Sequence, residues 1–212
     1  MKKTLFIATA LLLLTFHLSP LTSQAQERFD VSAFGGLNFC QIDGDDAGSY
    51  SHTGLRAGVG TSFFLGWDER TPWRVVVELA FSQKGSRIVR DDFQRTISLN
   101  YVELPIMMSY TLLDHRLRLA AGVAPAVQVG ASVLDYGGEH NAAHEANYKR
   151  FDYLPLVASA RYLFTDNLGF ELRFQTSMLS ITEQNAHPAY RIVTSNTGSF
   201  NRSISAGFSY TF

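Results

Sequence analysis

Apolar and polar residues alternate with a period of two along much of this sequence, and this alternation is the strongest constraint on its fold. In the final ten residues, the even positions carry Ile, Ala, Phe, Tyr and Phe, whereas the odd positions carry only Ser, Gly and Thr. Further upstream, Phe170 and Leu172 alternate with Glu171 and Arg173. Successive side chains of a β-strand point to opposite faces, so this pattern predicts strands with one apolar and one polar face.

Eight segments of the mature chain fit this alternation. They lie at 29–39, 53–65, 73–82, 95–111, 115–129, 151–164, 168–175 and 203–212. In the fourth segment the apolar phase changes between Tyr101 and Val102, which predicts a β-bulge. The fifth is rich in Ala, but Gly122, Pro125 and Gly130 would break a helix, so we predict a strand with Pro125 at a bulge or a strand end.

The connections between these segments alternate between long and short. The long ones are 40–52, 84–94, 131–150 and 178–202, and the tight ones lie near 113–115 and 165–167. An even strand number with this loop pattern is typical of outer-membrane barrels, whose periplasmic turns are short. We therefore predict an all-β fold, an eight-stranded antiparallel up-and-down transmembrane β-barrel, with both chain ends on the periplasmic side.

The first 25 residues have the pattern of an export signal. Lys2 and Lys3 precede an apolar run of twelve residues, and small residues occupy the −3 and −1 positions of a cleavage site after Ala25. The apolar run is shorter than the roughly 20 residues of a membrane-spanning helix, so a secretory signal peptide is the better interpretation. We predict a signal peptide at 1–25, cleaved after Ala25, and one outer-membrane β-barrel domain at 26–212.

The charged strand residues indicate which face of the barrel meets lipid. An Arg or Lys on the lipid face costs about 2–4 kcal/mol at the bilayer midplane, so the charged face is predicted to line the lumen. Its members are Arg56, Arg74, Glu78, Glu103, Arg118, Arg161, Glu171 and Arg173. The lumen of an eight-stranded barrel is just wide enough for side chains to fill, and buried charges need partners. We predict a packed ion-pair network that includes Glu78 or Glu103 with Arg56 or Arg173.

Aromatic residues give two further indications of a membrane barrel. Phe208, Tyr210 and the terminal Phe212 resemble the C-terminal assembly signal of bacterial outer-membrane proteins. Other aromatic residues lie near the predicted strand ends, where an interfacial girdle is expected. These are Trp67, Trp73, Tyr110, Tyr162 and Tyr210.

No pattern for a metal or cofactor emerges. His140 and His144 have a spacing that could hold a metal on a helix, but they lack the Glu of the zinc-protease motif and fall in a predicted outer loop. The cluster around Asp43 does not have the spacing of an EF-hand. A single Cys excludes a Cys-cluster metal site, and no dinucleotide or phosphate-loop motif is present. We therefore assign no catalytic, cofactor-binding or metal-binding residue.

Five motifs in chain order resemble the PorT-type outer-membrane β-barrel family of Bacteroidetes, often called porin family proteins. They are 35–39 with 41–45, Gly54 with 57–58, 78–79 with 82–85, 99–105, and 121–122 with Pro125. The resemblance spans most of the mature chain and is weakest in the long loops. It implies an outer-membrane barrel, a link to protein secretion in some members, and no catalytic residues.

The expected function is that of a non-enzymatic integral outer-membrane β-barrel protein of a Gram-negative bacterium, with a side-chain-filled lumen and a structural or interaction role through its external loops. Expected partners are outer-membrane lipid, the outer-membrane assembly machinery and an envelope or extracellular protein. The net charge of −1 argues against nucleic acid.

Three alternative functions remain open at this point. The first is an accessory component of protein secretion or envelope assembly. The second is a soluble periplasmic ligand-binding barrel, in which the large apolar residues would face inward. The third is a lipid-modifying enzyme that uses His52, next to Ser51, with His187 at the outer rim.

Overall fold

The computed structural model describes the chain over residues 29–44, 50–65, 71–90, 93–113, 116–135, 147–182 and 198–212. Eleven β-strands form one sheet. They are β1 (Phe29–Asp43), β2 (His52–Phe64), β3 (Trp73–Arg90), β4 (Phe93–Glu103), β5 (Ile106–Leu112), β6 (Leu117–Val123), β7 (Ala126–Leu134), β8 (Phe151–Asp152), β9 (Pro155–Leu163), β10 (Leu168–Ser177) and β11 (Phe200–Thr211). Among these residues, no helix is long and apolar enough to cross a membrane.

Prolines accompany three breaks that each divide one pass of the barrel into two strands. Pro105 lies between β4 and β5, Pro125 lies between β6 and β7, and Pro155 follows the break after β8. A proline has no backbone N–H to donate, but its carbonyl group still accepts. The bridging hydrogen bonds, each 2.9 Å long, run from Glu78 to Pro105, from Leu104 to Pro125 and from Ala124 to Pro155. The eleven strands, less these three breaks, make eight passes, and the strand end predicted at Pro125 is confirmed.

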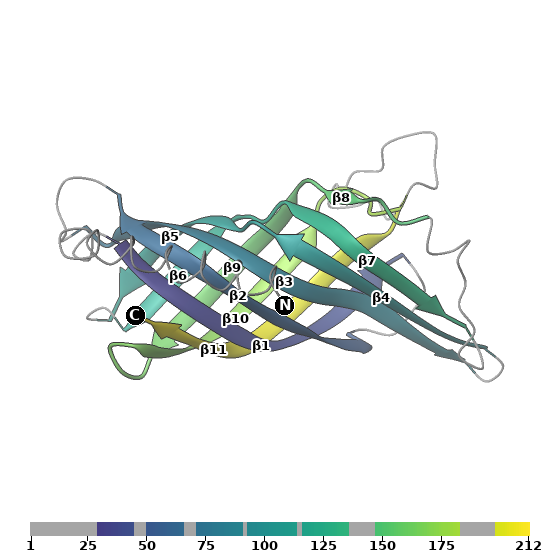
Figure 1. Cartoon of the computed structure of the whole chain (residues 1–212), viewed down its shortest axis with the longest axis horizontal. Coiled ribbons are helices and arrows are strands. Elements are labelled where there is room, and N and C mark those ends of the chain that lie inside the picture. Colours follow the sequence, from purple (N-terminus) through teal and green to yellow (C-terminus); the bar gives the residue numbers. More distant parts are fainter. Residues whose placement is uncertain are drawn as a thin grey trace, which may run out of the picture.

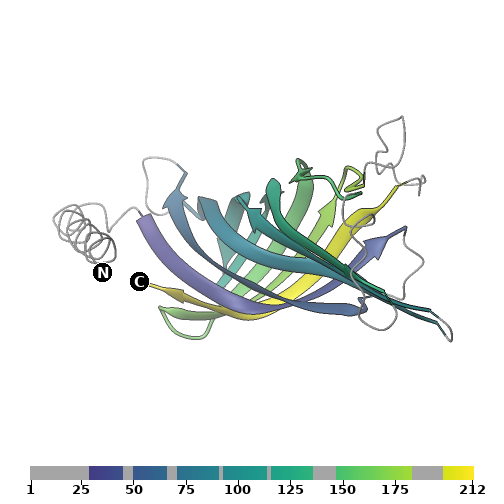
Figure 2. The same cartoon turned by 45° about the vertical axis from the view of Figure 1, so that its right-hand side comes forward.

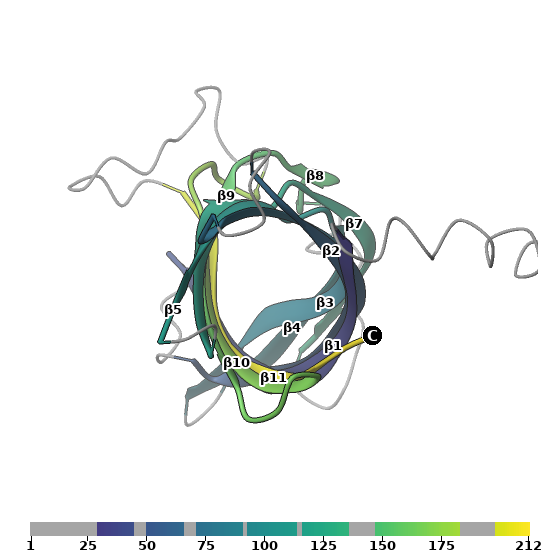
Figure 3. The ribbon, with the colours of Figure 1, turned by 90° about the vertical axis from the view of Figure 1, so that its left-hand side faces the viewer.

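The sheet closes on itself. β1 lies between β2 and β11, and β2 pairs with β3, so no edge is left between the first and last passes. The pairings between consecutive passes are antiparallel, and Figure 3 shows the resulting ring along the barrel axis. The predicted all-β, eight-stranded antiparallel barrel is confirmed.

The first strand begins and the last strand ends at the same end of the barrel, which we call the terminal end. Ser32 of β1 pairs with Thr211 of β11, and the amide of Phe212 donates to the carbonyl of Val31 at 2.9 Å. The tight connections from β5 to β6 and from β9 to β10 lie at this same end (Figure 1). At the opposite end, which we call the hairpin end, β3 and β4 project beyond the rest of the barrel (Figure 2).

The projecting hairpin corrects the prediction of a long loop at 84–94. β3 continues to Arg90, β4 begins at Phe93, and the two strands pair without a break up to these residues. Each face of the hairpin mixes polar and apolar residues: Lys84, Ser86 and Ile88 are buried on one face, and Arg87 and Val89 are exposed on the other. The period-2 signal is therefore lost there. β1 and β7 also extend beyond their predicted ends, to Asp43 and Leu134.

The predicted change of phase between Tyr101 and Val102 does not occur. Every second residue from Ile97 to Ser109 is buried without a slip. Tyr101 faces the interior because the lumen is apolar toward the hairpin end. The irregularity that the predicted β-bulge called for is present one residue earlier, where the register of β4 with β7 shifts between Asn100 and Tyr101.

Large apolar side chains cover the outer surface of the barrel. Leu55, Leu79 and Leu172 are 56%, 53% and 49% exposed. Soluble monomers rarely expose a continuous apolar surface of this kind, whereas membrane barrels present one to lipid hydrocarbon. The alternative of a soluble barrel with its large apolar residues turned inward is therefore wrong.

Aromatic side chains gather on the outer surface near the terminal end. They contact one another as Trp73 with Tyr110 at 4.8 Å between ring centroids, Tyr162 with Phe164 at 5.6 Å, and Tyr210 with Phe212 at 5.2 Å. This is the position of an interfacial girdle. Trp67, also predicted for the girdle, lies outside the described residues.

Candidate functional site

The charged interior of the barrel is the most distinctive chemical feature of the molecule. The structure places all eight predicted lumen residues on the inner face of the wall: Arg56, Arg74, Glu78, Glu103, Arg118, Arg161, Glu171 and Arg173. The side chains of Arg74 and Arg118 retain 14% and 11% of their exposure, and the other six are buried. From the terminal end toward the hairpin end, the interior has four layers of different chemistry.

The central layer joins three arginines to two glutamates. Glu78 contacts Arg56 and Arg173 at 2.8 Å each, and Arg161 at 3.6 Å. Glu171 contacts Arg161 at 2.6 Å, Arg173 at 2.9 Å and Arg56 at 3.6 Å. Each carboxylate therefore neutralises parts of three guanidinium groups. The arrangement satisfies the requirement that buried charges be paired, and it leaves this layer with one net positive charge.

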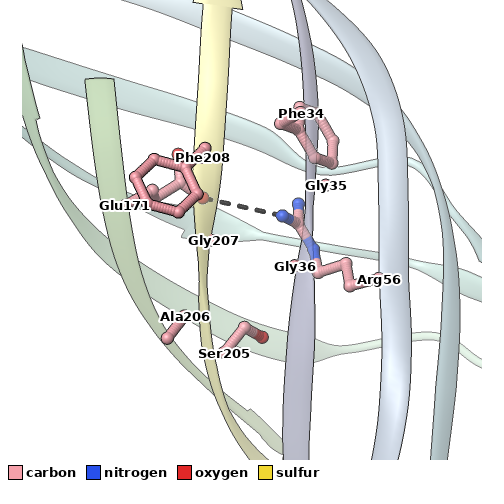
Figure 4. Close-up of a pocket in the computed structure, with 9 residues that line it drawn as sticks. All are labelled: Phe34, Gly35, Gly36, Arg56, Glu171, Ser205, Ala206, Gly207 and Phe208. Carbon is pink, nitrogen blue, oxygen red and sulfur yellow. Dashed lines mark ion pairs between the residues drawn. The ribbon is translucent and has the colours of Figure 1, made fainter. Parts of the chain in front are cut away.

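Two glycines let Arg56 and Glu171 meet inside the lumen although two strands lie between them. Arg56 of β2 and Glu171 of β10 are separated by β1 and β11, and the strand register places Gly36 and Gly207 between them in one row. Neither glycine has a side chain to intervene, so Arg56 reaches Glu171 (Figure 4). The ring of Phe34 lies 4.2 Å from the Arg56 guanidinium carbon and holds it from the other side.

A smaller polar layer follows toward the hairpin end. Lys84 contacts Glu103 at 2.6 Å, and the Gln175 amide donates to the same carboxylate at 3.1 Å. Nearby, the buried Asp152 accepts a hydrogen bond from the Ser177 hydroxyl. Sequence reasoning missed Lys84 because it was assigned to a loop, and it missed Asp152 because β8 is only two residues long. The predicted pairing of Glu78 or Glu103 with Arg56 or Arg173 is confirmed for Glu78, whereas Glu103 pairs with Lys84.

An apolar cluster closes the interior next to the hairpin end. Its buried members are Ile42, Ile97, Leu99, Tyr101, Ala126, Val133 and Ile181. The Tyr101 hydroxyl accepts a hydrogen bond from the Asn201 amide at 3.2 Å, so its polar atom is satisfied. Ile181 comes from the segment after β10, and its backbone donates to Ser199 at 2.8 Å and accepts from Lys149 at 2.7 Å. This segment is thereby fixed between the chain before β8 and the chain before β11.

The terminal end of the lumen is more open than the other layers. Asp30 contacts both Arg74 and Arg118, the latter at 3.5 Å, and accepts a hydrogen bond from the Ser62 hydroxyl at 3.3 Å. A recess of 310 Å³ lies here, with Arg116 also on its wall. Small cavities of 10 Å³ also border the central layer. Each could hold about one water molecule.

Three of the residues considered for chemistry, Ser51, His52 and Asp43, lie in the described part of the chain. The Ser51 hydroxyl accepts a hydrogen bond from the backbone of Arg87 at 2.9 Å, and His52 is half-buried. Asp43 forms an ion pair with Arg202 at 3.0 Å. The described part of the chain contains no group of three or more His, Cys, Asp or Glu residues that could hold a metal ion. The other candidates, His140, His144 and His187, lie outside that part.

The three aromatic residues of the predicted assembly signal lie on the outer surface of the last strand and at its end. Phe208, Tyr210 and Phe212 are 58%, 48% and 70% exposed. Phe208 also packs edge-to-face on Phe170 of the neighbouring strand, with 5.5 Å between ring centroids. The last strand therefore presents a row of aromatic rings to the surroundings of the barrel.

Comparison with known proteins agrees with this architecture. The family described as "Outer membrane protein beta-barrel domain" matches residues 23–183. No curated protein matches the chain.

Several solved structures have a similar fold. Ail of Yersinia pestis, in complex with the heparin analogue sucrose octasulfate, is 10% identical with a TM-score of 0.50, over 86% of this chain and 99% of Ail. Neisserial surface protein A is 12% identical with a TM-score of 0.45, over 87% and 97% of the two chains. OprG of Pseudomonas aeruginosa is 9% identical with a TM-score of 0.40, over 87% and 96%. At 10% identity, the likeness to Ail extends to the fold alone.

Proposed function

We propose that this chain, which belongs to the outer membrane protein beta-barrel domain family, is a non-enzymatic structural or interaction protein that acts through its external surface rather than through its lumen. The chain is an outer-membrane β-barrel protein, and the family is one of Gram-negative outer membranes.

The observation that carries the proposal is the closure of the lumen at three successive levels. Buried ion pairs fill the central layer, Lys84 and Glu103 fill the next, and the apolar cluster around Tyr101 fills the last. Channels for large solutes need barrels of about 16–18 strands, in which side chains no longer meet across the lumen. A filled interior stabilises a barrel but gives solutes no path.

The projecting hairpin supplies a surface for interaction. β3 and β4 remain paired up to Arg90 and Phe93, and β7 adds a third strand beside β4 up to Leu134. Such a paired ribbon is more rigid than a loop of equal length and can present side chains to a protein of the envelope or the extracellular space. Arg87 and Val89 are exposed on it.

Orientation and assembly complete the proposal. The terminal end faces the periplasm, the hairpin end faces outward, and the apolar outer belt contacts outer-membrane lipid. The exposed row of Phe208, Tyr210 and Phe212 is the signal for the outer-membrane assembly machinery. The chain is exported by a signal peptide cleaved after Ala25, and among barrel subfamilies its motifs favour the PorT-type group of Bacteroidetes.

Conductance across planar lipid bilayers tests the proposal. We expect the refolded protein to insert without opening a steady ion-conducting channel, because three layers of side chains close the lumen. A porin reconstituted in the same way serves as the positive control. Reproducible conductance steps from the purified protein would overturn the closed-lumen function and point to transport.

A further inference from the structure

The positive charge inside the barrel is not balanced in the half nearer the terminal end. The buried or half-buried charges there comprise five arginines and three carboxylates, an excess of two positive charges. The arginines are Arg56, Arg74, Arg118, Arg161 and Arg173, and the carboxylates are Asp30, Glu78 and Glu171. Glu103 of the next layer lies close enough to act on Arg56 and Arg173, so the positive charge that remains uncompensated is at Arg74 and Arg118, which share Asp30. A buried charge without a counter-charge is costly, so this site calls for an anion.

Arg118 has the least compensation of these arginines. Among the described residues its guanidinium contacts one carboxylate, Asp30, at 3.5 Å, and Arg74 already engages the same oxygen. Its Nε–H is buried and has no hydrogen-bond partner. A guanidinium can donate five hydrogen bonds, so most of the donor capacity of Arg118 is unused.

Arg118 also lies where a ligand could reach it. It lines the 310 Å³ recess at the terminal end, together with Arg74 and Arg116. That volume leaves space for a small ion and its hydration. Figure 3 looks into the barrel from this end.

The walls of the recess favour an oxyanion. Arg74 is held with its guanidinium carbon 3.9 Å from the centre of the Phe64 ring, so it is positioned before any ligand arrives. The hydroxyl-bearing residues Thr165 and Thr211 also line the recess. Asp30 and Asp166 also line the recess and oppose anion binding, but the three arginines outnumber them. Planar guanidinium groups bind phosphate-type oxygens in pairs, which a spherical chloride ion cannot exploit.

We propose that the recess at the terminal end binds a small phosphate-type oxyanion through Arg74, Arg116 and Arg118. The ligand would supply the missing negative charge and accept hydrogen bonds from Arg118. The same chemistry could come from free phosphate or from a phospholipid headgroup at the membrane surface. The inference does not depend on the proposed function, because a closed barrel can hold an anion in its vestibule whatever its partners are.

Calorimetric titration of inorganic phosphate into the refolded full-length protein in zwitterionic detergent, at constant ionic strength in chloride, tests the site. We expect saturable binding, and a loss of affinity of about tenfold or more in Arg118→Gln, since a charge-assisted contact is removed. The matched control is Arg87→Gln, an exposed arginine at the opposite end, which should bind like the unaltered protein. Electrophoretic mobility before and after boiling verifies that each variant is folded. Should Arg118→Gln fail to fold, Arg116→Gln at the rim replaces it, with a several-fold loss expected.

The outcomes separate the alternatives. No saturable binding to the unaltered protein, or equal affinity in Arg118→Gln and Arg87→Gln, would overturn the proposal. Glycerophosphoglycerol, the soluble headgroup diester of phosphatidylglycerol, distinguishes the two sources of ligand. Tighter binding of this diester would identify a lipid headgroup site, and tighter binding of inorganic phosphate would identify a free-anion site.

Discussion

The two adjacent glycines of β1 allow a test of how closely β1 and β11 approach each other in the barrel wall. Gly36 faces inward between Arg56 and Glu171, whereas Gly35 faces outward. A methyl group at position 36 would lie 2.3 Å from the carbonyl oxygen of Ala206, where ordinary contact begins at 3.4 Å. At position 35 nothing lies within 4 Å of it.

These distances set the expected magnitudes. In Gly36→Ala, β1 and β11 must separate by about 1 Å (3.4 minus 2.3) because the clash is with backbone. Overpacking costs about 1–3 kcal/mol, and a weakened ladder hydrogen bond adds about 1 kcal/mol, so a loss of about 2–4 kcal/mol in unfolding free energy is expected. Gly35→Ala avoids the clash and restricts the unfolded chain, so a change within about 1 kcal/mol, on the stabilising side, is expected.

Denaturant unfolding in lipid vesicles, followed by tryptophan fluorescence, measures both values in one system. The two variants differ by one position and by the same methyl group, so effects of composition cancel. Equal stability of Gly36→Ala and the unaltered protein would refute the close-approach argument. A comparable loss in Gly35→Ala would refute the assignment of the two faces.

Three further predictions concern the interior and the apolar outer surface. Glu171→Gln should cost about 3–5 kcal/mol of unfolding free energy because three arginines lose a buried partner. The control is Asp135→Asn, which removes the partly exposed ion pair of Asp135 with Arg95 (2.6 Å) and should cost less than about 1 kcal/mol. Equal losses in urea titrations would contradict the buried network. Lys84→Met should lower the unfolding free energy by an amount similar to Glu171→Gln, because Glu103 loses its buried partner. Adding Glu103→Gln should restore most of that loss. A double variant that is no more stable than Lys84→Met would show that Lys84 and Glu103 are not coupled. Leu172→Arg should cost about 2–4 kcal/mol in vesicles if this side chain meets hydrocarbon, and an unchanged unfolding curve would place Leu172 in water.

The sequence predicts the strands well wherever one face meets lipid and the other meets the polar lumen. Glu171 and Arg173 alternate with Phe170 and Leu172, and this contrast identifies the inner face without any knowledge of strand pairing. The prediction fails where the contrast disappears. Beyond residue 83, each face of β3 carries both polar and apolar residues, so the strand reads as a loop although its ladder continues.

Prediction from the sequence meets the same limit for residues that face the lumen. Near the hairpin end the interior is apolar, so Leu99 and Tyr101 resemble lipid-facing residues and imply a change of phase that is not there. Specific ion pairs depend on strand register, which fixes the row of Arg56, Gly36, Gly207 and Glu171. The sequence names the charged residues but not their register, and so it could not predict which carboxylate joins which arginine.

The central claim is that the apolar face of the barrel meets lipid, and spin labels in liposomes test it most directly. Cys40 is first replaced by Ala, so that the native thiol cannot take up the label. A nitroxide at position 172 is then compared with one at position 87 on the projecting hairpin. The account predicts that the label at 172 relaxes mainly with oxygen, which concentrates in hydrocarbon, and that the label at 87 relaxes mainly with a water-soluble nickel chelate. Preferential relaxation of the label at 172 by the nickel chelate would contradict the transmembrane barrel.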